Sequence, residues 1–182
     1  MIMSRIWLTS DTHFCHDKEF VWQARGFKNI NEMNTEIIKR WNAVVAPEDI
    51  VYHLGDVMLN DTERGIYYLK QLKGNIYIAF GNHDTSGRIE EYKKCWNIKD
   101  VQMGYRIKVP GKRTAILTHY PTVTGNMGDL RTLNFFGHTH QEDNNFFLDY
   151  PNMYHVGLDS HNCTPVLLED ALEEIKQKKG NN

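Results

Sequence analysis

The chain has 182 residues, 41% of them hydrophobic, and its 21 basic and 23 acidic side chains give a formal net charge of −2. This length suits one compact domain over residues 1–182, and the composition excludes a disordered chain. The small net charge argues against a dedicated nucleic-acid binder, which would carry a basic excess, but it is compatible with a small anionic substrate.

The chain has three cysteines, Cys15, Cys95 and Cys163. An odd number of cysteines without a CxxC pair indicates neither a disulfide framework nor a thiolate zinc site. The longest apolar run, residues 76–80, is far shorter than a membrane span. The N-terminus has no apolar core of a signal peptide. We therefore expect a soluble protein of the reducing cytoplasm, without a membrane partner.

In the first half of the chain, short apolar runs alternate with segments of helical spacing. The runs predict strands at residues 5–10, 50–54 and 75–80. The helical spacing predicts helices at residues 32–45, ended by Pro47, and 62–73, ended by Gly74. This alternation implies parallel strands joined by right-handed crossovers.

The second half is richer in predicted strands. Residues 104–109 and 113–118 alternate around a Pro-Gly-Lys turn, which predicts a hairpin. Further strands are predicted at residues 132–137, 145–149, 153–157 and 165–168, and a final helix at residues 169–179. We therefore expect an α/β fold, built as a two-sheet β-sandwich flanked by α-helices.

Polar clusters rich in Asp and His directly follow five of the predicted strands. Their candidate metal ligands are Asp11, His13, Asp56, Asn82, His119, His138 and His140. α/β sheets bind small molecules and ions at the carboxyl ends of their strands. Because these side chains follow strand ends, we expect them to converge on one such binding site. Oxygen and imidazole donors without a thiolate suit manganese, iron, zinc or nickel.

Seven ligands are too many for one tetrahedral ion, but they fit two ions that share a carboxylate about 3.5–4 Å apart. The pairs Asp11/His13 and His138/His140 are spaced so that, on extended backbone, both members face one way. A glycine precedes three of the ligands, where it lets the chain turn and approach the ions closely.

The order of these motifs resembles that of the calcineurin-like metallophosphoesterase superfamily. The motifs are D-x-H at 11–13, G-D at 55–56, G-N-H-D at 81–84, a single His119 and G-H-x-H at 137–140. The opening D-T-H-F-C-H, residues 11–16, is similar to a small bacterial and phage branch, although Cys15 stands where that branch usually has glycine. Residues 156–168 also look like the closing strands of the superfamily.

The resemblance implies a role for each motif residue. The first metal would be held by Asp11, His13 and His140, and the second by Asn82, His119 and His138, with Asp56 bridging the two. His83 would not bind metal but would lie over the substrate phosphate, oriented by Asp84. A second interpretation of Asp84 is a cap for the following turn.

We therefore predict a phosphoesterase that uses two divalent ions, manganese first among them, with a metal-bridging hydroxide as nucleophile. The expected substrate is a small phosphate ester, with diesters preferred, because two ions and two carboxylates leave only about +2 of charge. The competing interpretation is a non-catalytic interaction scaffold of the same fold, which would tend to lack His83. A nuclease acting on DNA ends would need a basic stripe that the chain lacks.

Several side chains have two open interpretations. His16 either contacts substrate or is a solvated loop residue, and Arg25 either clamps phosphate or lies on the surface. His53 either supports the site as a donor or packs in the core. The aromatic residues of the loop at 14–32 either line the substrate or anchor that loop; they are Phe14, Phe20, Trp22 and Phe27. No chemical role is expected for His155, and none for His161 unless its loop reaches the rim of the site.

Overall fold

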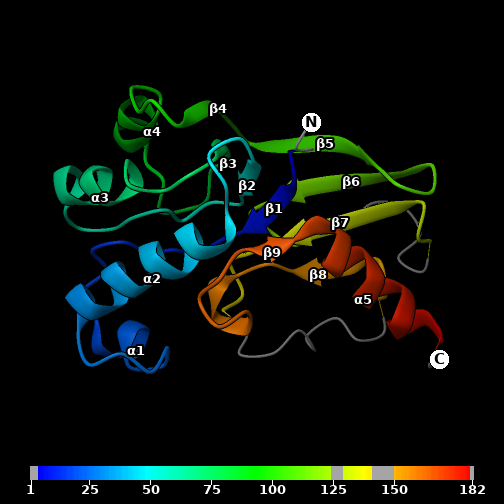
Figure 1. Cartoon of the computed structure of the whole chain (residues 1–182), viewed down its shortest axis with the longest axis horizontal. Coiled ribbons are helices and arrows are strands. Elements are labelled where there is room, and N and C mark those ends of the chain that lie inside the picture. The colour runs from blue at the N-terminus through cyan, green and yellow to red at the C-terminus, as the bar shows by residue number, and fades with distance from the viewer. Residues whose placement is uncertain (1–3, 124–128, 141–149, 181–182) are drawn as a thin grey trace.

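The structure is a computed structural model that describes residues 4–123, 129–140 and 150–180. Over these residues the chain forms two β-sheets flanked by α-helices (Figure 1), as the sequence predicts. The strand order is β4-β3-β2-β1-β9 in the first sheet and β5-β6-β7-β8 in the second.

The first sheet contains the three strands predicted in the first half of the chain. Its parallel strands are β1 (Ile6–Thr9), β2 (Ile50–His53), β3 (Asn75–Ala79) and β4 (Ile98–Gln102), and β9 (Val166–Leu167) runs antiparallel to β1. Neither β4 nor the helix before it, α4 (Ser86–Tyr92), is predicted from the sequence. Because β4 is an edge strand with mostly exposed side chains, it carries no apolar run that could reveal it.

The second sheet begins with the predicted hairpin. Its strands are β5 (Gly104–Val109), β6 (Arg113–Thr118), β7 (Thr132–Phe136) and β8 (Met153–His155), with parallel pairing of β6 with β7 and of β7 with β8. The strand predicted at residues 145–149 lies outside the described residues. After β8 come a 3-10 turn, η1 (Leu158–Ser160), and the last helix, α5 (Leu168–Gly180).

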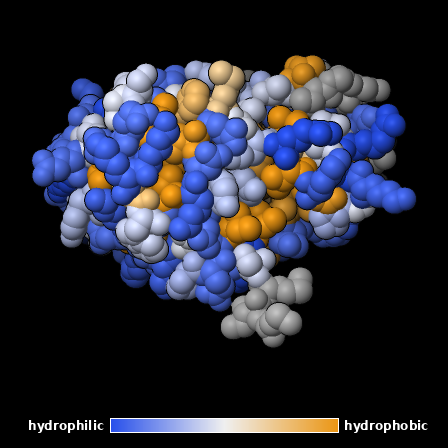
Figure 2. Space-filling view, turned by 90° about the horizontal axis from the view of Figure 1, so that it is seen from above, coloured by the Kyte–Doolittle hydropathy of each residue, from blue (hydrophilic) through white to orange (hydrophobic). Residues whose placement is uncertain are grey.

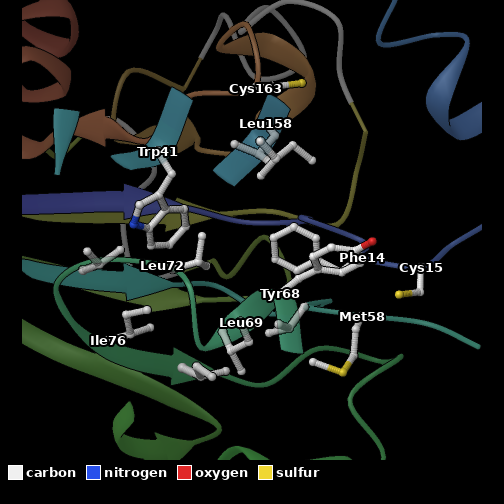
Figure 3. Packing of buried hydrophobic residues seen from close by; sticks show 14 of the residues in the cluster. Phe14, Cys15, Trp41, Met58, Tyr68, Leu69, Leu72, Ile76, Leu158 and Cys163 are labelled. Carbon is white, nitrogen blue, oxygen red and sulfur yellow. The ribbon is translucent and has the colours of Figure 1, made fainter. Parts of the chain in front are cut away.

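Two apolar cores lie on the two faces of the first sheet. The first core packs this sheet against the helices, with Trp41, Tyr68 and Leu69 lying over the strands (Figure 3). The second core lies between the two sheets and includes α5 residues such as Leu172. Strand alternation explains the division, because Trp7 of β1 enters the first core and Leu8 the second.

Local hydrogen bonds set the helix ends. The helix α2 (Ile30–Val44) begins two residues before the predicted start, because the Asn29 side chain accepts a hydrogen bond from the Glu32 backbone N–H at 2.9 Å. The helix α3 (Thr62–Leu69) ends before the predicted residue 73. The Asn97 side-chain amide donates to the carbonyls of Leu69 and Leu72, both at 2.9 Å, and so satisfies acceptors that the helix end leaves free.

The loop predicted at residues 14–32 contains a short helix, α1 (Glu19–Trp22), beside α2 (Figure 1).

On the face that carries α4, β4 and β5, apolar patches lie among polar side chains (Figure 2). Within the described ranges, no helix has the length and apolarity needed to cross a lipid bilayer.

Candidate metal centre

The structure brings all seven predicted ligands together at the ends of β1, β2, β3, β6 and β7. The first group consists of Asp11, His13 and His140. The Nε2 atoms of His13 and His140 are 3.1 Å apart, and Asp11 Oδ1 lies 3.6 Å from the first and 3.9 Å from the second. Ligands that each lie about 2.1 Å from one divalent ion are separated by about 3–4 Å, so this spacing suits a common ion.

The second group surrounds His119. Its Nε2 atom lies 3.0 Å from Asn82 Oδ1, 3.2 Å from His138 Nδ1 and 3.5 Å from Asp56 Oδ2. The same Asp56 oxygen is 3.9 Å from His13 Nε2 in the first group. Asp56 therefore faces both groups, the position that a shared carboxylate requires.

The nitrogen and oxygen atoms of both groups are better arranged to bind metal ions than to hydrogen-bond with one another. Asp11 Oδ1 is buried without a hydrogen-bond partner among the described residues. His119 Nδ1 lies 2.8 Å from the carbonyl of Leu54, and His140 Nδ1 lies 2.9 Å from Asp159 Oδ2. Because these bonds place a proton on Nδ1, the neutral form of each ring points the Nε2 lone pair into the centre, where a metal cation can receive it.

Burial keeps two of the imidazoles available as ligands. It lowers the pKa of His13 and of His138, so both rings stay neutral at pH 7. Burial alone would raise the pKa of Asp11, but the nearby His13 outweighs it and holds that pKa well below its usual range. Asp11 is therefore ionised at neutral pH, as a metal ligand must be.

The sequence predicts extended backbone at the two ligand pairs, but the structure has left-handed turns there. Five of the seven ligands have positive φ: 59° at Asp11, 50° at His13, 55° at Asp56, 68° at His138 and 47° at His140. The left-handed conformation turns the chain sharply behind each strand, and alternate side chains converge through these turns. Cys15 also has a φ of 64°, which explains why glycine is usual at its position in the related branch.

Glycines let the backbone pass directly against ligand side chains. A Cβ atom on Gly137 would collide with Ser10 Oγ and Asp11 Oδ2, and one on Gly81 would collide with Asp56 Oδ1. At Gly55 a Cβ would lie 2.5 Å from the Gly81 backbone nitrogen. A side chain larger than glycine would therefore collide with protein atoms at all three glycines that precede ligands.

Arg25 is not placed to clamp phosphate, and the prediction of a substrate contact for it is not supported. Its side chain is only 2% exposed and donates from Nε to Asp159 Oδ1 at 2.8 Å. Its Nη2 and Nη1 atoms donate to the carbonyls of Asp11 at 2.7 Å and Thr12 at 3.1 Å. Arg25 therefore holds the first ligand loop in place instead of facing substrate or lying on the surface.

Asp159 is the functional residue that sequence reasoning missed. It joins Arg25 to His140, and its hydrogen bond raises the pKa of His140. Burial would raise the pKa of Asp159 itself, but His140 and Arg25 outweigh this and hold it below the usual range. A carboxylate on the outer nitrogen of a metal-binding histidine fixes the ring and raises its basicity. In the sequence, Asp159 is one acidic residue in a turn, with no motif to mark it.

Asp84 organises the ligand loops. Its Oδ2 accepts hydrogen bonds from the backbone N–H groups of Asp56 at 2.7 Å and Gly81 at 2.8 Å. Its Oδ1 accepts from the Val57 N–H at 3.1 Å and from the Tyr92 hydroxyl at 2.7 Å. These bonds join the loops after β2 and β3, whereas Thr85 caps α4. The structure thus favours a positioning role over direct orientation of the His83 ring.

His83 and His16 line a cavity of about 520 Å³ in front of the first group. The His83 side chain is 42% exposed, and its Nε2 lies 3.9 Å from Asp56 Oδ2. The His16 ring lies 5.4 Å from that of His13 and 6.4 Å from that of His83. Burial, followed by repulsion from His13 and His83, lowers the pKa of His16 to about 4, so it adds no positive charge near pH 7.

The remaining histidines have structural contacts. His53 is buried, stacks on Trp41, and its Nε2 lies 2.9 Å from the Thr12 hydroxyl. It therefore both packs in the core and supports the loop between two ligands. His161 Nε2 donates to the carbonyl of His155 at 2.9 Å, and neither ring contributes to the two ligand groups.

Two sheets with paired Asp, Asn and His donors at their strand ends are the architecture of a metallophosphoesterase. The chain belongs to the calcineurin-like phosphoesterase family, whose model matches residues 4–179. Members of this family are generally metal-dependent phosphoesterases that bind divalent ions.

The relatives of this chain span nearly its whole length. The protein MJ1445 of Methanocaldococcus jannaschii is 34% identical over 98% of this chain and 96% of its own length. The gene 66 protein of Mycobacterium phage D29 is 27% identical over 90% of this chain and 93% of its own length. The crystal structure of AQ665 from Aquifex aeolicus aligns with a TM-score of 0.70 at 23% identity, covering 95% of this chain and 100% of that one. This last similarity supports the fold.

Proposed function

We propose that this protein hydrolyses phosphate esters with the help of two divalent metal ions, and that it prefers phosphodiesters. The observation that carries the proposal is the convergence of seven oxygen and nitrogen donors into two adjoining groups, the first of which contains the buried, unpartnered Asp11 Oδ1. One ion would be held by Asp11, His13 and His140, and the other by Asn82, His119 and His138, with Asp56 facing both. When bound, such ions polarise phosphate oxygens and acidify water, so that phosphorus can be attacked at neutral pH.

His83 is the proposed general acid. Its backbone N–H donates to Asp56 Oδ1 at 2.9 Å, which leaves the ring free to face the cavity. From there the imidazole can deliver a proton to the departing alkoxide or stabilise its developing charge. Asp84 would support this step by holding the loop that carries His83.

The charge around the cavity supports the preference for diesters. Two divalent ions with Asp11 and Asp56 leave about +2, which suits a diester monoanion better than a monoester dianion. No Lys or Arg side chain lines the cavity in the described parts of the chain. Arg25 is committed to Asp159 and two carbonyls, and Arg131 pairs with Asp129 at the opposite end of β7.

We propose manganese first among the ions that suit oxygen and imidazole donors without thiolate, with iron, zinc or nickel as the alternatives. The three cysteines are free thiols, which supports our proposal of a reducing, cytoplasmic location.

The test compares kcat/KM for bis(4-nitrophenyl) phosphate and 4-nitrophenyl phosphate on one manganese-loaded sample, with elemental analysis of its metal content. We expect two ions per chain, hydrolysis that chelation abolishes, and a higher value for the diester. Replacing Asp56 by Asn should weaken both ions. One ion or fewer per chain would refute the dinuclear assignment, and a preference for the monoester would refute the substrate class. Full metal loading without hydrolysis of either ester would point to the non-catalytic scaffold.

A further inference from the structure

The aromatic residues of the segment at 14–32 separate into two groups in the structure. Phe14 and Phe27 are buried in the first core, with 0% and 7% exposure, and anchor the segment to the body. Figure 3 shows Phe14 among the other core residues. Trp22 is partly buried against the same core. Phe20, on α1, is different because 71% of it is exposed. Anchoring therefore explains three of the aromatic residues and leaves Phe20 unexplained.

Phe20 lies on the wall of the cavity that contains the first ligand group. One side of this cavity is polar and is formed by His13, His16, His83, His140 and Asp159. Another part of the lining is apolar and comes from α1 and the residues just after it, with Phe20, Val21 and Ala24. A group bonded to a phosphate at the metal centre would therefore extend toward an apolar surface.

This apolar wall is fixed to the metal centre. Val21 is 8% exposed and packs in the core, and the Phe27 N–H donates to the Trp22 carbonyl at 2.9 Å. One residue after Ala24, Arg25 bonds the carbonyls of Asp11 and Thr12. The wall and the ligand loop are thus joined before any substrate arrives, so binding against the wall costs little ordering.

The geometry at Phe20 suits a flat ring. The His16 ring lies 5.9 Å from the Phe20 ring at an interplanar angle of 88°, so it contacts Phe20 edge to face and holds its orientation. Without Lys or Arg among the described residues that line the cavity, an anionic substituent would find no partner. The Asp159 carboxylate, the acidic residue of the lining, is already paired with Arg25 and His140. The occupant that fits is neutral, planar and apolar on its faces.

We propose that Phe20 and the α1 wall bind a neutral aromatic group of the substrate, of the aryl or nucleobase class, next to its phosphate. This inference rests on the proposed function of the site for the phosphate itself. The aromatic group stacks on Phe20 while its phosphate faces the two ligand groups. Phe20 is accordingly a specificity residue that contacts substrate, without a part in the bond-breaking step.

The test uses phosphonates, which cannot be hydrolysed, so that binding is measured apart from catalysis. Calorimetry on manganese-loaded protein compares methylphosphonate, phenylphosphonate and the phosphonate analogue of adenosine 5′-monophosphate. Stacking of one ring contributes enough to tighten binding about tenfold. We expect that gain for at least one aromatic ligand over methylphosphonate, and the tighter of the two identifies the source of the ring. Equal affinities for all three ligands would overturn the inference.

Two variants assign the effect to Phe20. Phe20→Ala should remove the tenfold advantage and leave methylphosphonate binding and metal content unchanged. Tyr67→Ala is the matched control, because Tyr67 is a 64% exposed aromatic residue on α3 that does not line the cavity. If the advantage persists in Phe20→Ala or disappears in Tyr67→Ala, the assignment is wrong. Discrimination by the wild type without hydrolysis of nitrophenyl esters would overturn the proposed function but not this inference.

Discussion

Replacing Asp159 by Asn tests whether a residue outside the ligand set controls the first metal group. Its Oδ2 accepts from His140 Nδ1 at 2.9 Å, and its Oδ1 accepts from Arg25 Nε at 2.8 Å. An amide of the same shape has one acceptor oxygen and one NH₂ donor, so one of the two neighbours would face another donor. The variant also removes the negative charge that makes His140 more basic.

The expected magnitude follows from this geometry. Loss of such a partner on the outer nitrogen of a ligating histidine lowers metal affinity by about 10–100-fold, which corresponds to about 1.4–2.7 kcal/mol. Only the group of Asp11, His13 and His140 contains the affected ring, whereas His119 in the other group is held by the Leu54 carbonyl. One of two binding steps should therefore weaken and the other should stay unchanged.

The assay is a competitive titration of metal-free protein with Mn²⁺ against a chelator of known affinity. The matched control is Asp129→Asn, because Asp129 also pairs with an arginine, Arg131, but lies away from the ligands at the start of β7. If both Mn²⁺ affinities of Asp159→Asn match those of the wild type within twofold, Asp159 does not control the first metal group. Equal weakening of both steps would also refute such a role, since the structure connects Asp159 to one group.

Three further predictions follow from the site and from the core. His83→Ala should lower kcat by about 10²–10⁴-fold with metal content intact, because the backbone N–H that binds Asp56 remains. Gly137→Ala should destabilise the protein by about 1–3 kcal/mol and weaken the first metal, because the new Cβ would collide with Asp11 Oδ2. Asp49→Asn should lower the free energy of unfolding of the metal-free protein, measured with urea, by about 3 kcal/mol, because Asp49 accepts four hydrogen bonds from its neighbours. Those bonds outweigh burial and lower its folded pKa, so its contribution is present at neutral pH and lost as the pH falls below about 4.

Each of these predictions has an outcome that would contradict it. Loss of metal from His83→Ala would make His83 a ligand. Gly87→Ala is the control for Gly137, because a Cβ there meets nothing within 4 Å, and equal effects of the two variants would rule out the collision. For Asp49→Asn, the free energy of unfolding should fall less steeply below pH ~4 than in the wild type. An unchanged slope would show that Asp49 does not titrate with folding.

The sequence by itself determined the ligand set and the central strands. Asp11, His119 and His138 were recognisable because each lies within three residues of the end of an apolar run, and strand ends are where such side chains converge. The first three strands were predictable because they lie in the middle of the sheet, with one face buried and the other at least partly covered, and so are rich in apolar residues. These features are local: a few consecutive residues carry the signal.

Tertiary structure alone decided the surroundings of those ligands. Asp159 lies 19 positions from His140 and 134 from Arg25, so no local pattern could connect the three. The same holds for Phe20, which differs from the buried Phe14 only in what the fold places around it. Left-handed turns replaced the expected extended backbone, because packing of several loops into one centre outweighs the local preference of each residue. Residue type and spacing therefore predict the metal ligands. The residues that hold those ligands, and those that line the substrate cavity, come from segments that meet only after folding.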